Sequence, residues 1–186
     1  TEWSKSIIKE CNKIKRDISA QDINSRKDLR TLNFVTIDGS NAKDFDDAVY
    51  AEESSDGFLL YVAIADVSEY VLQDSSLDKE AFSRATSVYF EKKVIPMLPE
   101  LISNKLCSLR PNEDKLVLTC EIYLDGEGEI KSYEFFNSVI CSKNRLTYDE
   151  VEKFYQKGQT ALSDDIVSNL NALKKIHALR RKIREE

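Results

Sequence analysis

Apolar segments separated by short polar turns run through the first two thirds of the chain and predict strands. Residues 32–37 predict a strand that leads into an acidic segment, 38–47, and residues 48–50 begin the next strand. Residues 58–65 are apolar almost throughout, which predicts a strand buried on both faces. The Gly-containing turn 54–57 joins the last two strands into a predicted hairpin.

The following part of the chain predicts a second, longer hairpin. Its strands are expected at 116–124 and 129–140, joined by the Gly-containing turn 125–128. Before it, the Pro-Met-Leu-Pro sequence at 96–99 predicts an extended path, because proline fixes the backbone, and this path enters a short helix at 100–109.

Helices are predicted at both ends of the chain and between the strands. Apolar positions at helical spacing predict an amphipathic helix over 2–18, and the polar residues after it, to 30, form a leading loop. Capping boxes start two further helices, with Ser75 and Asp78 before 77–85 and with Thr147 and Glu150 before a helix that ends near Gly158. The last helix, from about 166, has a basic tail. The predicted fold is α+β, a twisted sheet or barrel with helices packed outside.

Composition narrows the class of protein. The 186 residues suit one domain or part of one, and 41% hydrophobic with 32% charged residues fits a globular chain. No apolar run reaches ~18 residues and no apolar segment follows the first five, so neither a membrane span nor a signal peptide is expected. Four scattered cysteines and a single histidine, His177, argue against a zinc site and favour a reduced, cytoplasmic chain.

The strongest candidate site is a cluster of four aspartates, Asp38, Asp44, Asp46 and Asp47. Crowded carboxylates repel each other unless solvent or a cation neutralises them, and carboxylate oxygens are the ligands that Mg²⁺ and Mn²⁺ prefer. A solvated acidic turn is the simpler alternative, because aspartate favours turns. A calcium loop fails on spacing. Phe45 within the cluster and the apolar strands around it place the carboxylates at the rim of a core.

The sequence Asp38-Gly39-x4-Asp44-Phe45-Asp46-Asp47-Ala48 resembles the catalytic motif of the ribonuclease II/ribonuclease R family, the RNB domain, and most of all its ribonuclease R branch. The likeness covers about residues 28–155 and continues in order through 62–68 (VAIADVS), 86–90 (TSVYF), 94–100 (VIPMLPE), 101–109 (LISNKLCSL) and 145–148 (RLTY). Residues 31–186 are therefore interpreted as the N-terminal part of an RNB catalytic domain, preceded by the N-terminal helix and leading loop at 1–30.

The resemblance implies a function for each motif residue. The four aspartates would bind Mg²⁺, with Mn²⁺ as an alternative, for hydrolysis of the terminal phosphodiester of RNA. Tyr89 would stack on bases near the 3' end, and Tyr148 would lie beside the cleaved bond as a catalytic and RNA-binding residue. Stacking on aromatic side chains suits single-stranded RNA, because every base has a π-face. Without the motif, each tyrosine would be read as a core residue with a hydrogen-bonded hydroxyl.

The implied activity is a 3'-to-5' exoribonuclease that degrades single-stranded RNA and releases nucleoside 5'-monophosphates. Family members continue with a second half that supplies an arginine, a glutamate and another aromatic residue, so this chain is expected to be truncated before that half and to be weakly active or inactive alone. The formal charge of −6 is unfavourable for contacts with RNA phosphates, which need a basic surface. The resemblance implies that RNA-binding domains lie elsewhere in the parent chain, as they do in family members. A non-catalytic RNB-like module, binding RNA or a protein, and a metal-dependent phosphoesterase with another substrate remain alternatives.

Overall fold

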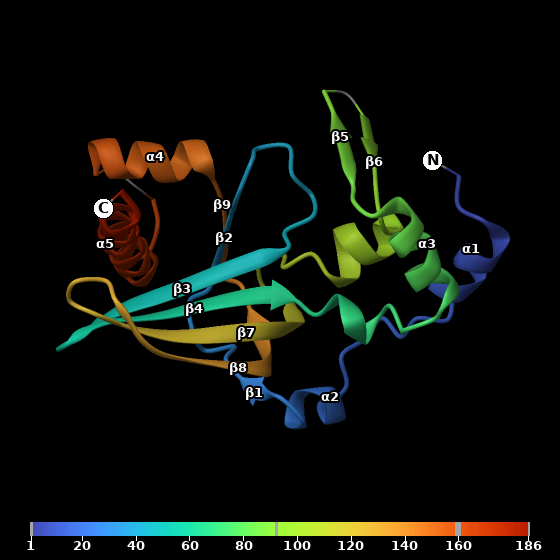
Figure 1. Cartoon of the computed structure of the whole chain (residues 1–186), viewed down its shortest axis with the longest axis horizontal. Helices are drawn as coiled ribbons and strands as arrows, with labels where there is room; N and C mark the ends of the chain where they lie inside the picture. Colours follow the sequence, from blue (N-terminus) through green and yellow to red (C-terminus); the bar gives the residue numbers. More distant parts are fainter. Residues whose placement is uncertain (1, 92, 159–160, 186) are drawn as a thin grey trace.

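One mixed sheet of seven strands forms the centre of the computed structural model, which describes residues 2–91, 93–158 and 161–185 (Figure 1). The strand order is β1-β8-β7-β4-β3-β2-β9, and β1 with β8 and β2 with β9 are parallel pairs in an otherwise antiparallel sheet. The strands are β1 (Lys27–Asp28), β2 (Val35–Asp38), β3 (Asp47–Ser54), β4 (Gly57–Ala65), β7 (Asp114–Asp125), β8 (Ile130–Cys141) and β9 (Asn144–Thr147).

Helices and a small hairpin surround this sheet, which confirms the predicted α+β class. The hairpin consists of β5 (Val88–Phe90) and β6 (Lys93–Ile95) and projects from the sheet (Figure 1). The helices are α1 (Lys5–Cys11), α2 (Ala20–Asn24), the 3-10 turn η1 (Val67–Glu69), α3 (Ser76–Arg84), the π-helix η2 (Ile102–Leu106), α4 (Tyr148–Lys157) and α5 (Asp164–Glu185). No helix in the described ranges is long and apolar enough to cross a membrane.

The sheet curls, because a short connection joins β8 to β9 although these strands lie far apart in the strand order. Four strands separate β8 from β9, yet only Ser142 and Lys143 connect them. Three Cα–Cα steps reach at most about 11 Å, so the two ends of the sheet approach each other here. The backbone N–H of Lys143 donates to the carbonyl of Phe34 at 2.8 Å, and Phe34 is fully buried inside the curl.

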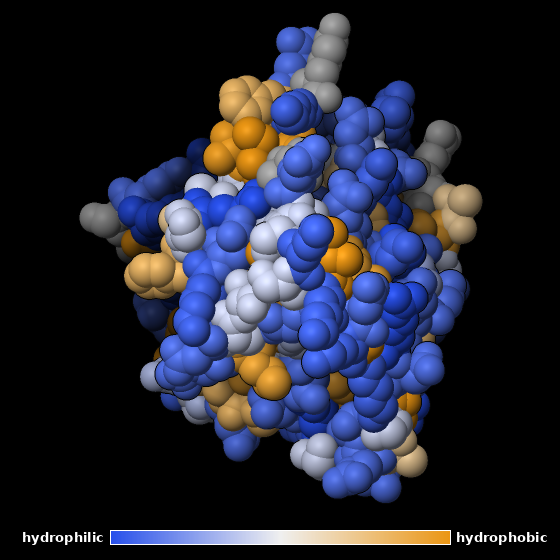
Figure 2. Space-filling view, turned by 90° about the vertical axis from the view of Figure 1, so that its right-hand side faces the viewer, coloured by the Kyte–Doolittle hydropathy of each residue, from blue (hydrophilic) through white to orange (hydrophobic). Residues whose placement is uncertain are grey.

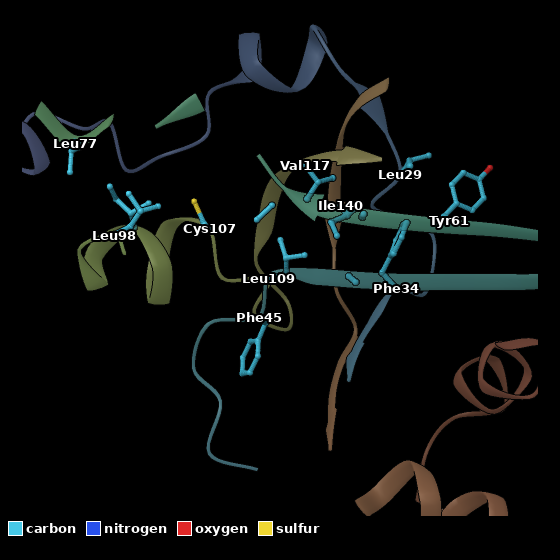
Figure 3. Close-up of a cluster of buried hydrophobic side chains, with 14 of the residues drawn as sticks. Leu29, Phe34, Phe45, Tyr61, Leu77, Leu98, Cys107, Leu109, Val117 and Ile140 are labelled. Carbon is cyan, nitrogen blue, oxygen red and sulfur yellow. The ribbon is translucent and has the colours of Figure 1, made fainter. Parts of the chain in front are cut away.

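Apolar clusters cover both faces of the sheet. On one face, α4 and α5 pack on β2, β3 and β9, with Val35, Leu146 and Leu170 among the buried contacts. On the other, the largest cluster joins the sheet to α1, α3 and the π-helix, as Figure 3 shows for Leu77, Leu98 and Leu109. The acidic segment contributes Phe45 to this second cluster, so the loop that carries the aspartates is anchored in the core.

The predicted N-terminal helix over 2–18 is wrong in extent. The first helix ends at Cys11, and a second one begins at Ala20. Ser19 and Asp22 form a capping box, in which each side chain accepts from the other residue's backbone N–H, and this local signal starts a new helix.

One detail of the strand predictions is corrected. Ile64 in β4 is 46% exposed, although the segment was expected to be buried on both faces. Apolar contacts with α5 reach Phe58 and Leu60, at the other end of the same strand, and not Ile64. The β5–β6 hairpin, which precedes the predicted extended path at 96–99, was not predicted from the sequence.

The remaining elements agree with the sequence. Both predicted sheet hairpins are present, and the π-helix lies within the predicted helix 100–109. Thr147 and Glu150 form the expected capping box, and Gly158 ends α4 in the left-handed conformation. Each of the four cysteines is a free thiol.

Candidate active site

The four aspartates occupy the end of β2, the loop after it and the start of β3, as predicted. Asp38 is the last residue of β2 and Asp47 the first residue of β3, and these strands are antiparallel neighbours. Asp44 and Asp46 belong to the connecting loop, which rises between α4 and the β5–β6 hairpin in Figure 1. The fold therefore brings the four acids to one edge of the sheet.

The loop is held by a segment that lies more than sixty residues further along the chain. The fully buried hydroxyl of Ser108 accepts a hydrogen bond from the backbone N–H of Phe45 at 3.1 Å and donates one to the carbonyl of Lys43 at 2.9 Å. The N–H of Leu109 donates to the carbonyl of Phe45 at 2.8 Å. These bonds fix the backbone on both sides of Asp44.

The carboxylates influence one another electrostatically. Burial first, and then the neighbouring charges of Asp44, Asp47 and Asp38, raise the pKa of Asp46 to about 6. Burial and Asp47 also raise the pKa of Asp38, while the positive charge of Arg145 opposes this rise. Asp46 keeps much of its surface in solvent, so screening reduces the energetic cost of its charge. A cation would relieve this repulsion.

The oxygens of the four aspartates are the kind of ligand that a hard divalent cation prefers. In the described parts of the chain, however, no three side chains of His, Cys, Asp or Glu form a group that could hold a metal ion. In the same structure, Asp44 Oδ2 accepts a hydrogen bond from the hydroxyl of Tyr89 at 2.8 Å. Metal binding at the cluster therefore stays a prediction.

Both predicted RNA-binding tyrosines lie at the surface beside the acids. Tyr89 in β5 and Tyr148 in the first turn of α4 are each 63% exposed, so neither is a core residue. The hydrogen bond to Asp44 raises the pKa of Tyr89. Tyr148 follows Thr147, which pairs with Asp38 in the sheet. Their exposed rings are free to contact a ligand at this edge, and their functional roles remain predictions.

A groove of about 690 Å³ separates the acidic loop from the β5–β6 hairpin. Lys43 and Asp44 line it on the loop side, Phe90 and Lys93 on the hairpin side, and Asn104 from the π-helix. The hairpin is unusually apolar for a projecting element, since Val88, Tyr89, Phe90 and Val94 are each more than 40% exposed. Figure 2 shows hydrophobic surface beneath the projecting tip near the top of the view.

The sequence prediction did not assign a role to Arg145. This residue of β9 donates two hydrogen bonds to backbone carbonyls at the start of the acidic loop. Its only sequence signal is its place at the head of the Arg-Leu-Thr-Tyr segment, 145–148, because the contact spans more than one hundred residues.

Comparison with known proteins defines the class of this chain. The model of the RNB domain matches residues 26–186, and the chain therefore belongs to the RNB domain family. Its similar relatives include ribonuclease R of Acidithiobacillus ferrooxidans, 44% identical over 99% of this chain and 42% of that protein. Ribonuclease R of Escherichia coli (strain K12) is 42% identical over 99% of this chain and 23% of that protein. The chain thus spans less than half the length of these relatives.

Solved structures agree with this assignment. RNase R of Mycoplasma genitalium in complex with double-stranded RNA matches with a TM-score of 0.93 and 38% identity, over 98% of this chain and 33% of that one. The same enzyme in complex with ribose-methylated single-stranded RNA also gives a TM-score of 0.93, at 36% identity, over 98% of this chain and 29% of that one. Yeast Ssd1, described as a pseudonuclease, shares the fold with a TM-score of 0.74 and 21% identity, over 88% of this chain and 20% of that one.

Proposed function

We propose that this chain supplies the acidic half of the active site of a 3'-to-5' exoribonuclease that hydrolyses single-stranded RNA to nucleoside 5'-monophosphates. The observation that supports it best is the placement of four aspartates at the end of β2, in the following loop and at the start of β3, with two exposed tyrosines on neighbouring elements. The chain's relatives are ribonucleases R, and its structural neighbours include RNA complexes of that enzyme.

In this proposal Asp38, Asp44, Asp46 and Asp47 hold Mg²⁺. When bound, the metal would neutralise the carboxylates and lower the pKa of the attacking water. Asp44 would act as a metal ligand either while it keeps the hydrogen bond from Tyr89 or after that bond is broken. The rings of Tyr89 and Tyr148 stack on or abut the last nucleotides, where each stacked base is worth ~1–3 kcal/mol. Because any base offers a π-face, the site accepts RNA of any sequence.

The decisive experiment replaces Asp46 by asparagine in the full-length gene product. The change keeps the side-chain shape but removes an anionic oxygen, so single-turnover cleavage of labelled single-stranded RNA should slow by at least ~10²-fold, about 2.7 kcal/mol of barrier. RNA affinity, measured by filter binding at one salt concentration, should be retained, because it depends mainly on phosphate and stacking contacts. Near-normal cleavage by the variant would show that Asp46 is a turn residue without a catalytic role.

A second candidate, a non-catalytic RNB-like module that binds RNA, is favoured by one observation. No three acidic, histidine or cysteine side chains of the described residues converge into a metal-holding group, and Asp44 is bound to Tyr89 instead. The same assay separates the two functions. A catalytic protein cleaves only with Mg²⁺ and loses cleavage in Asp46→Asn, whereas a binding module retains RNA without cleaving it under either condition.

A further inference from the structure

Arg145 contacts the acidic loop near both of its ends. Its Nη2 donates hydrogen bonds to the carbonyl of Gly39 at 2.7 Å and to that of Ser40 at 3.0 Å, where the loop leaves β2. Its guanidinium also lies over the ring of Phe45, with Cζ 5.5 Å from the ring centroid, close to where the loop enters β3. One side chain therefore bridges the two ends of the segment that carries Asp44.

The sheet register places Arg145 at this position. In the parallel pair of β2 and β9, Arg145 is the partner of Thr36, and Asp38 is the partner of Thr147. Since side chains alternate along a strand, Arg145 and Asp38 share one face of the sheet, while Leu146 points to the opposite face. Leu146 is 4% exposed and packs in the cluster with α4 and α5, which fixes the direction of its neighbour.

The guanidinium of Arg145 is partly withdrawn from solvent, although its hydrogen bonds to Gly39 and Ser40 lie at the surface. Its Nε is buried and has no hydrogen-bond partner among the residues that the structure describes. The same holds for the hydroxyl of Thr36, its partner across the strand pair. Buried polar groups without partners are rare and costly, so an arginine held in this way indicates that its contacts with Gly39 and Ser40 serve a purpose.

We propose that Arg145 is a positioning residue: it fixes the two ends of the acidic loop, which limits the rearrangement that the aspartates need in order to gather around a divalent cation. The proposal rests on the proposed function, because it assumes that the aspartates hold a metal. Residues that orient metal ligands commonly change metal affinity by about 10–100-fold when they are mutated. Arginine suits the task, because its rigid, planar fork of donors can bind two carbonyls while its face stacks on an aromatic ring.

The positioning effect and the charge of Arg145 act on metal affinity with opposite signs. A positive charge close to the carboxylates repels a cation, so its removal alone should tighten metal binding. Loss of the loop's anchor should weaken metal binding instead. The direction of the change in Arg145→Gln therefore reports which effect dominates, and the proposal requires a loss of affinity.

The experiment compares four forms of the full-length gene product: wild type, Arg145→Gln, Arg145→Lys and the control Lys43→Gln. Lys43→Gln removes the same charge from an exposed side chain of the same loop, whose contacts with Ser108 use only its backbone. Hydrogen exchange of peptides spanning 39–46 is measured in EDTA, and Mn²⁺ affinity is measured by calorimetry. Arg145→Gln should exchange faster in this loop and bind Mn²⁺ at least ~10-fold more weakly. Lys43→Gln should exchange normally and bind Mn²⁺ as tightly as the wild type or more tightly.

Arg145→Lys keeps the charge but loses the planar fork, so it should also show faster exchange and weaker binding. If Arg145→Gln does not fold, the Arg145→Lys variant tests whether Arg145 positions the loop. Normal loop exchange together with equal or tighter Mn²⁺ binding in the arginine variants would overturn the proposal. Failure of the proposed function gives a different result: the wild type would bind no Mn²⁺, or the Asp46→Asn variant would bind Mn²⁺ as tightly as the wild type. Hydrogen exchange in EDTA would still decide whether Arg145 holds the loop.

Discussion

Ser108 offers the sharpest test of how the acidic loop is fixed. Substitution by alanine removes only the hydroxyl, so the cavity is small and the change acts through hydrogen bonds. The fully buried hydroxyl accepts from the N–H of Phe45 and donates to the carbonyl of Lys43. Without it, the buried N–H of Phe45 has no partner, whereas the carbonyl of the exposed Lys43 can turn to water.

The magnitude follows from these two bonds. An unsatisfied buried N–H costs about 1–3 kcal/mol, and the loss of a second, solvent-replaceable bond costs about 0.5–1.5 kcal/mol. Ser108→Ala should therefore lower the free energy of unfolding by about 1.5–4.5 kcal/mol. For a chain of this length each kcal/mol shifts the melting temperature by about 2–4 °C, so a fall of roughly 3–18 °C is expected.

Urea unfolding followed by circular dichroism measures the loss, and hydrogen exchange of peptides covering 43–46 localises it. Ser103→Ala is a matched control, because Ser103 lies on the same segment but its hydroxyl donates only to the side chain of its neighbour Asn104. The control should change stability by less than about 0.5 kcal/mol. If Ser108→Ala were as stable as Ser103→Ala, with unchanged exchange in the loop, Ser108 would not be the anchor of the acidic segment.

Three further predictions concern the frame of the site. Asn169→Ala should lower the free energy of unfolding in urea by about 2–4 kcal/mol, because the buried amide accepts from the N–H of Ala51 and donates to the carbonyl of Asn33. Substitution of the exposed Asn171 by alanine should leave stability nearly unchanged. Hydrogen bonds from Thr147 hold the pKa of Glu150 below its usual 4.5. The contribution of this carboxylate to folding stability is therefore complete above pH 4.5 and is lost as the pH falls through the lowered pKa. Glu150→Gln should weaken this acid dependence of the melting temperature. Tyr89→Ala in the full-length protein should lengthen the final undigested RNA on sequencing gels, and an unchanged end product would count against stacking by Tyr89.

Local sequence signals were sufficient for the elements that carry the site. The four aspartates stand between two apolar strands, so their place at the end of β2 and the start of β3 follows from the pattern alone. The capping box of Thr147 and Glu150 likewise fixed the start of α4, and with it the position of Tyr148. These predictions succeed because strand alternation, turn chemistry and capping depend on residues a few positions apart.

Other features depend on long-range packing and could not be read from local patterns. Ile64 is exposed because contacts with α5 stop at the other end of its strand, although its own segment is as apolar as a buried one. The hydrogen bond from Tyr89 to Asp44 joins two segments 45 residues apart, and it links the hairpin to the acidic loop.

The sequence by itself determined which residues carry the candidate chemistry, since the acids and the two tyrosines stand in short motifs flanked by regular elements. Only the tertiary structure decided what holds them in place. Arg145 reaches the carbonyls of Gly39 and Ser40 because the curled sheet sets β9 parallel to β2, although the contact spans 106 residues to Gly39. Pairing of that kind depends on closure of the whole sheet around a common core, which no local pattern of residues encodes.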